Sequence, residues 1–107
     1  MIYELKKYVP HAGKAQALKN RFEAVTLPIF KKVGIRVVHC FEDPAEPDAL
    51  YYMTTFDSAE QRDAAWKAFG ANAEWKAAKA ASETDGPLLA SQSSTELHPT
   101  RFSPADR

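Results

Sequence analysis

Branched, aromatic and polar residues mix in four short stretches of the chain in a way that is typical of β-strands. These stretches span residues 2–9, 35–42, 50–56 and 88–97, and the last carries the weakest strand signal. Pro44 and Pro47 lie between the second and the third stretch. Because proline cannot donate a backbone hydrogen bond to a sheet, residues 43–48 are predicted to form a loop.

Helical periodicity begins at Lys14, after a turn over residues 10–13. One apolar stripe recurs at spacings of four, three and four residues, through Leu18, Phe22, Val25 and Ile29. Pro28 lacks the amide that a regular helix needs, so we expect the helix to kink or restart there. Gly34 stands just past the predicted helix end, where a left-handed residue commonly terminates a helix.

Ser58 begins a second helical segment, and Gln61 follows at the spacing of a capping box. In this motif the serine oxygen accepts a hydrogen bond from one free amide, and the glutamine reaches back to another. Asn72 is placed to cap a third, alanine-rich helix that carries Trp75. The turn-forming residues 85–87 end that helix.

The elements follow one another in the order β-α-β-β-α-β, with the second helix split in two. This order predicts an α+β, ferredoxin-like fold, in which a four-stranded antiparallel sheet carries its helices on one face. Residues 35–42 and 50–56 have large apolar side chains in both alternation sets. A sheet that is apolar on both faces needs a second cover, so we expect an isologous dimer in which two sheets pair.

Four segments of the chain resemble segments of the NIPSNAP family. They are Ile2-Tyr3-Glu4-Leu5 with Gly13-Lys14, Arg21-Phe22, Glu74-Trp75, and the closing His98-Pro99-Thr100-Arg101-Phe102-Ser103-Pro104. The closing segment is the most specific, and the resemblance extends over nearly the whole chain. It implies the dimeric α/β-barrel fold, but the family has no agreed enzymatic reaction to carry over.

The chain divides into a domain over residues 1–98 and a C-terminal tail over residues 99–107. In the tail, Phe102 stands between Pro99 and Pro104 without a helix or strand pattern. Such a segment is either disordered or docked on a neighbour. We expect it to dock across the dimer, because the aromatic side chain would otherwise be exposed to water.

Composition agrees with one small domain. The chain has 107 residues, of which 45% are hydrophobic and 26% are charged; this is enough for a single core. The 14 basic and 14 acidic residues cancel, which argues against binding to nucleic acid through bulk charge. Basic groups concentrate in residues 1–36 and acidic groups in 37–63. They form either solvated faces or complementary patches that steer self-association.

The location of the protein is suggested by what the sequence lacks. One cysteine cannot form an internal disulfide, so nothing indicates an oxidising compartment. No apolar run approaches the roughly 18 residues of a membrane span. We therefore expect a cytoplasmic protein with no membrane span.

Most reaction classes lack their motifs in this chain. The four glycines stand at predicted element ends, so no glycine-rich phosphate loop is expected. The three histidines lie far apart in the sequence, and His39 and Cys40 are strand neighbours that point to opposite faces. We therefore expect no metal and no cofactor, and we predict Cys40 to be a buried structural thiol.

His39 titrates near neutral pH and is predicted on a mostly apolar strand face. It is either a core or interface histidine or the catalytic base of an aromatic pocket. The other side chains of that pocket would be Tyr3, Tyr52, Thr54, Arg62, Trp66 and Trp75. Aromatic walls with a few polar tips are typical of small-molecule sites, although the same aromatics also build cores. Arg62 would hold an anionic ligand at the pocket mouth or be a solvated helix charge.

These observations favour a homodimeric protein that binds a small hydrophobic or aromatic ligand or serves in assembly. The alternative is a cofactor-independent monooxygenase or isomerase with His39 as base and an aromatic or quinone-like substrate, by analogy with related α/β-barrel dimers. A third hypothesis is a structural module that recruits partner proteins through its polar helical surface.

Overall fold

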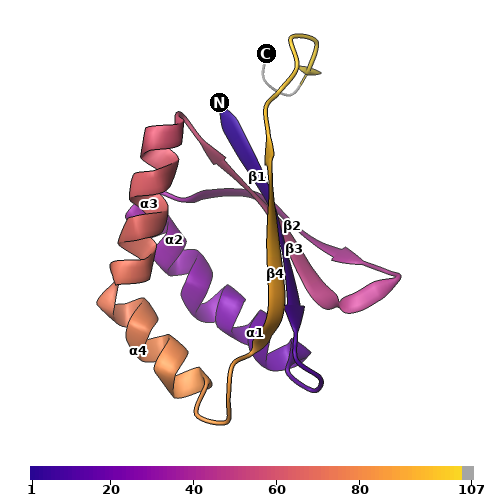
Figure 1. Cartoon of the computed structure of the whole chain (residues 1–107), viewed down its shortest axis with the longest axis vertical. Helices are drawn as coiled ribbons and strands as arrows, with labels where there is room; N and C mark the ends of the chain where they lie inside the picture. The colour runs from indigo at the N-terminus through magenta and orange to yellow at the C-terminus, as the bar shows by residue number, and fades with distance from the viewer. Residues whose placement is uncertain (105–107) are drawn as a thin grey trace.

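Four antiparallel strands form one sheet, and the helices pack on a single face of it (Figure 1). The strands are β1 (Ile2–Pro10), β2 (Arg36–Asp43), β3 (Glu46–Phe56) and β4 (Leu89–Leu97). They lie in the order β2-β3-β1-β4. The predicted ferredoxin-like architecture is therefore confirmed. The computed structural model describes residues 1–104, so the last three residues of the predicted tail lie outside the described part of the chain.

The first helical segment contains a π-turn just before its proline. It consists of α1 (Ala15–Arg21), η1 (Phe22–Thr26) and α2 (Leu27–Val33). Pro28 lies in the first turn of α2, where its missing amide costs little. The predicted restart is therefore confirmed. The wider π-turn moves the buried stripe by one residue, so that Thr26 is buried and Val25 only half-buried.

Local capping residues begin and end the helices as predicted. Gly34 ends α2 in the left-handed conformation, at φ 91°. The Ser58 hydroxyl accepts a hydrogen bond from the amide of Gln61 at the start of α3 (Ala59–Ala71), at 3.1 Å. The side-chain oxygen of Gln61 accepts from the amide of Asp57, one residue before the cap. Asn72 likewise caps α4 (Ala73–Ser82).

The predicted loop over residues 43–48 is wrong, because β2 and β3 form a tight hairpin there. Asp43 pairs with Glu46 across a two-residue turn, and the Asp43 carboxylate accepts from the amide of Ala45 at 2.9 Å. Pro47 is part of β3. The pairing of β3 with β1 extends only as far as Leu50, so Pro47 has no partner in β1. A strand with a neighbour on one side only tolerates the missing proline amide.

The core lies between the sheet and the helices. Alternate residues of β3 point toward the helices, and of these Tyr52 and Phe56 are fully buried. They pack with Phe22 and Phe30 of the first helical segment. Each such side chain contributes about 1.5–3 kcal/mol through the apolar surface it removes from water. The core therefore consists mainly of aromatic rings contributed by β3 and the helices.

The other face of the sheet carries exposed apolar side chains. Val38 is 39% exposed, Phe41 44% and Leu97 40%, and no helix of the described chain covers this face (Figure 1). We call it the open face. It includes Tyr3 and Met53, because side chains alternate along a strand and the residues next to these two point toward the helices. A second cover remains a prediction.

A register shift in β2 corrects two expectations about its side chains. Val37 pairs with Thr54 but His39 pairs with Met53, so the extra residue Val38 forms a bulge. Val37 packs against the core, whereas His39 lies on the open face and is exposed. The expectation of His39 on a mostly apolar strand face assumed regular alternation along β2, and the bulge at Val38 interrupts it. Cys40 is exposed rather than buried.

Candidate functional site

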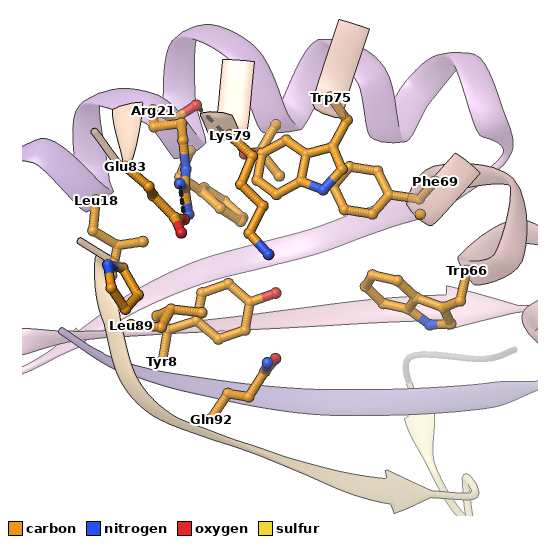
Figure 2. A pocket seen from close by; sticks show the side chains of 14 residues that line it. Tyr8, Leu18, Arg21, Trp66, Phe69, Trp75, Lys79, Glu83, Leu89 and Gln92 are labelled. Carbon is orange, nitrogen blue, oxygen red and sulfur yellow. Dashed lines mark hydrogen bonds and ion pairs between the residues drawn. The ribbon is translucent and has the colours of Figure 1, made fainter. Parts of the chain in front are cut away.

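A cavity of about 470 Å³ lies between the helices and the sheet (Figure 2). We call it the helix-side cavity. Its aromatic lining comes from five side chains on β1, η1, α3 and α4, namely Tyr8, Phe22, Trp66, Phe69 and Trp75. Its charged lining consists of Arg21, Lys79 and Glu83, and Gln92 of β4 adds an amide. The cavity thus combines aromatic walls with a few polar groups.

Arg21 is the buried cation of this cavity. Its side chain is only 7% exposed, because Arg21 follows Leu18 by three residues and so falls on the inner face of the first helical segment. One guanidinium nitrogen, Nη1, donates to Glu83 Oε2 at 2.7 Å and to Ser82 Oγ at 3.0 Å. The guanidinium also lies 4.9 Å from the centroid of the Trp75 ring. Within residues 1–104, its buried Nε has no hydrogen-bond partner.

Two tyrosine hydroxyls meet at the sheet side of the cavity. Tyr8 Oη and Tyr52 Oη are 2.6 Å apart, and the two rings meet edge to face at 5.2 Å between centroids. Burial raises the pKa of both tyrosines above the usual value. Both hydroxyls therefore remain protonated at neutral pH, and Tyr8 presents a neutral hydrogen-bonding group to the cavity.

Trp66 is held by a buried carboxylate. The indole Nε1 donates to Glu4 Oε1 at 2.7 Å, and Lys6 Nζ lies 3.8 Å from the same oxygen. The Lys6 ammonium also lies 4.4 Å from the centroid of the Trp66 ring. Burial lowers the pKa of Lys6. These contacts fix the orientation of one aromatic wall.

The family of the chain follows from its match to known proteins. The NIPSNAP family model matches residues 3–104, which is nearly the whole chain. The chain belongs to the NIPSNAP family. The resemblance found in the sequence is thus confirmed.

Solved structures of similar proteins support the same fold. A NIPSNAP domain protein from Burkholderia xenovorans is 22% identical, with a TM-score of 0.82 over 97% of this chain and 99% of that one. A NIPSNAP family protein from Agrobacterium tumefaciens is 21% identical, with a TM-score of 0.83 over 96% of each chain. A Chloroflexus aurantiacus protein named for antibiotic biosynthesis monooxygenase activity is 25% identical, with a TM-score of 0.60 over 94% of each chain. No curated protein matches the chain.

The NIPSNAP fold separates the predicted site residues into two groups. Trp66 and Trp75 line the helix-side cavity, and the hydroxyl of Tyr52 contacts Tyr8 at its wall. Tyr3 and His39 instead line a shallow depression of about 330 Å³ on the open face. Because the sheet stands between the two groups, they do not form one pocket within a chain. A catalytic role for His39 stays a prediction.

Two further predicted residues of this NIPSNAP chain do not line the helix-side cavity. Thr54 is fully buried, and its hydroxyl donates to the Glu4 carbonyl at 3.5 Å. Arg62 forms ion pairs with Asp63 and Glu96. His98 and then Arg62 lower the pKa of Glu96. Both predicted residues are therefore engaged with other parts of the protein.

The charged lining of the helix-side cavity was not predicted from the sequence. Arg21 carried a usable signal, because a cation on the apolar stripe beside Phe22 needs a buried partner. Lys79 follows Trp75 by four residues and therefore shares its helix face. Glu83 and Gln92 carried no such signal, because chain topology alone brings β4 and the end of α4 beside Arg21.

No helix within residues 1–104 is long and apolar enough to cross a membrane. In the same part of the chain, no three His, Cys, Asp or Glu side chains lie close enough together to hold a metal ion.

Proposed function

We propose that this NIPSNAP protein is a homodimer that binds a small ligand in the helix-side cavity. The observation that carries the proposal is the cavity itself, about 470 Å³, in which aromatic walls stand beside several charged and polar side chains. Small-molecule sites commonly have this size and composition. A cytoplasmic location is part of the proposal, and the single cysteine supports it.

The homodimer is supported by the open face of the sheet. Val38, Phe41 and Leu97 expose apolar side chains there; large apolar areas of this kind usually mark an interaction site. A second copy offers the same face, so an isologous contact would cover both at once. The tail residues Pro99 and Ser103 border the depression on this face. This position supports docking of the tail across the dimer.

Substitutions at Gly70 test the position of the ligand site. Gly70 lines the cavity, and an added Cβ would have no atom of the described structure within 4 Å beyond its own helix backbone and chain neighbours. Gly70→Leu is expected to narrow the cavity and to abolish ligand binding while the helix is kept or stabilised. Gly70→Ala is the matched control, because it adds one methyl group and should raise stability by about 0.5–1 kcal/mol without loss of binding.

Native mass spectrometry of the purified proteins provides the readout. We expect a dimer with added ligand mass for the wild type and Gly70→Ala, and a dimer without added mass for Gly70→Leu. A monomer would refute the homodimer. Equal added mass in all three proteins would refute this cavity as the site. Turnover of an aromatic or quinone-like compound without a cofactor would instead support the monooxygenase or isomerase hypothesis.

A further inference from the structure

We infer that the ligand of the helix-side cavity is an organic carboxylate with a flat apolar body. This inference rests on the proposed function, since it names the ligand class of the same site. Three features of the cavity carry it, namely a buried guanidinium with an unused donor, a second cation without an ion-pair partner in the described part of the chain, and a wall of packed aromatic rings.

The first feature is the unused donor of Arg21. Glu83 and Ser82 occupy Nη1, whereas the buried Nε has no partner within the described chain. A buried donor without a partner costs about 1–3 kcal/mol. A ligand carboxylate whose oxygen reaches Nε would remove this cost, because it accepts hydrogen bonds and carries the opposite charge.

The second feature is the charge balance of the lining. Among the described residues, Arg21, Lys79 and Glu83 are its charged side chains, which gives the lining one net positive charge. Glu83 is already paired with Arg21, and Lys79 has no ion-pair partner within residues 1–104. Figure 2 shows the Lys79 side chain pointing into the cavity. One excess positive charge matches a monoanion better than a phosphate dianion or a cation.

The third feature is the shape of the apolar walls. The rings of Phe69 and Trp75 lie 4.7 Å apart between centroids, with their planes only 32° apart. Trp66 extends this wall, perpendicular to Phe69 at 6.1 Å. Overlapping rings of this kind favour a flat aromatic or cyclic body that packs against them. The Tyr8 hydroxyl adds one neutral hydrogen-bonding group beside the same ligand.

The probes are three compounds that share a naphthalene body and carry a polar group of different charge. They are 2-naphthoate, the neutral 2-naphthamide and the cationic 2-naphthylmethylammonium, titrated into the dimer by isothermal calorimetry. We expect 2-naphthoate to bind at least tenfold more tightly than 2-naphthamide, and the cation to bind most weakly. Lys79→Gln should reduce this preference severalfold. Lys76→Gln is the matched control, because Lys76 lies on the same helix but does not line the cavity.

The outcomes separate this inference from the proposed function. Equal binding of the anion and the amide, with loss of both in Gly70→Leu, would overturn the carboxylate inference and leave the ligand site in place. Tighter binding of the cation would also overturn it. Failure of all three probes to bind would overturn the inference, and only the native mass spectra would then support a ligand site.

Discussion

Protonation of Tyr8 and Tyr52 is tied to folding. Their hydroxyls share a hydrogen bond of 2.6 Å, and burial raises the pKa of each in the folded protein. The folded state therefore favours the protonated phenols, while the unfolded chain ionises them near pH 10. Their contribution to stability is fully present below about pH 10 and is lost as the pH rises beyond that value.

This gives a prediction for alkaline stability. The free energy of unfolding should fall above pH 10 by up to about 1.4 kcal/mol per pH unit for each of the two tyrosines. Urea unfolding followed by circular dichroism at pH 9 and at pH 11 measures the loss. The double variant Tyr8→Phe/Tyr52→Phe is the control and should lose much less between the two pH values. An equal loss in both proteins would contradict the assignment.

At the scale of elements, α4 carries a large share of the cavity wall. It holds Trp75 and Lys79, yet none of its residues is buried. Its own apolar burial therefore stabilises it little, and its start depends on the cap at Asn72. The Asn72 side-chain oxygen accepts from the amide of Trp75 at 2.9 Å, which places the indole at the first turn of the helix.

Loss of this cap should be measurable. Asn72→Ala is expected to reduce the free energy of unfolding by about 1 kcal/mol, because one helix amide loses its acceptor. Asn72→Asp keeps the acceptor and adds a charge that suits the helix N-terminus, so it should be neutral or stabilising. The midpoints of urea denaturation compare the three proteins. If Asp and Ala were equally destabilising, the cap would not be the cause.

At the scale of the whole molecule, the sheet separates two surfaces. The helices cover one face, and the open face lies on the other (Figure 1). The helix-side cavity lies between the sheet and the helices, and the shallow depression lies on the open face. Dimerisation through the open face would therefore leave the cavity within each chain. A substitution on either face should disturb only the property of that face.

The dimer prediction follows from this division. Leu97→Lys places a charge among the apolar side chains of the open face, opposite Tyr3, and should weaken dimerisation at least tenfold because the charge must be desolvated. Ala64→Lys makes the same type of change on the exposed surface of α3 and should leave the dimer intact. Sedimentation velocity over a range of concentrations measures both. Unchanged dimerisation of Leu97→Lys would refute the open face as the interface.

The order of the elements, their caps and the family could all be predicted from the sequence. Gly34, Ser58 and Asn72 act on amides or carbonyls within one turn of themselves, so their roles are readable without knowledge of the fold. The strands were predictable for a similar reason, because alternation and branched residues are local properties. The prediction of a loop over residues 43–48 was wrong for a tertiary reason. β3 tolerates Pro47 because β1 does not extend far enough to pair with it, and the sequence does not show where β1 ends along β3.

Which side chains come together in the candidate site could be seen only in the tertiary structure. The bulge at Val38 depends on how β2 registers against β3, and it carries His39 away from the helices. The pairing of Arg21 with Glu83 joins residues on α1 and just after α4, and no pattern along the chain relates them. Side-chain contacts across such separations arise from packing, whereas sequence periodicity reports only which side of an element a residue occupies.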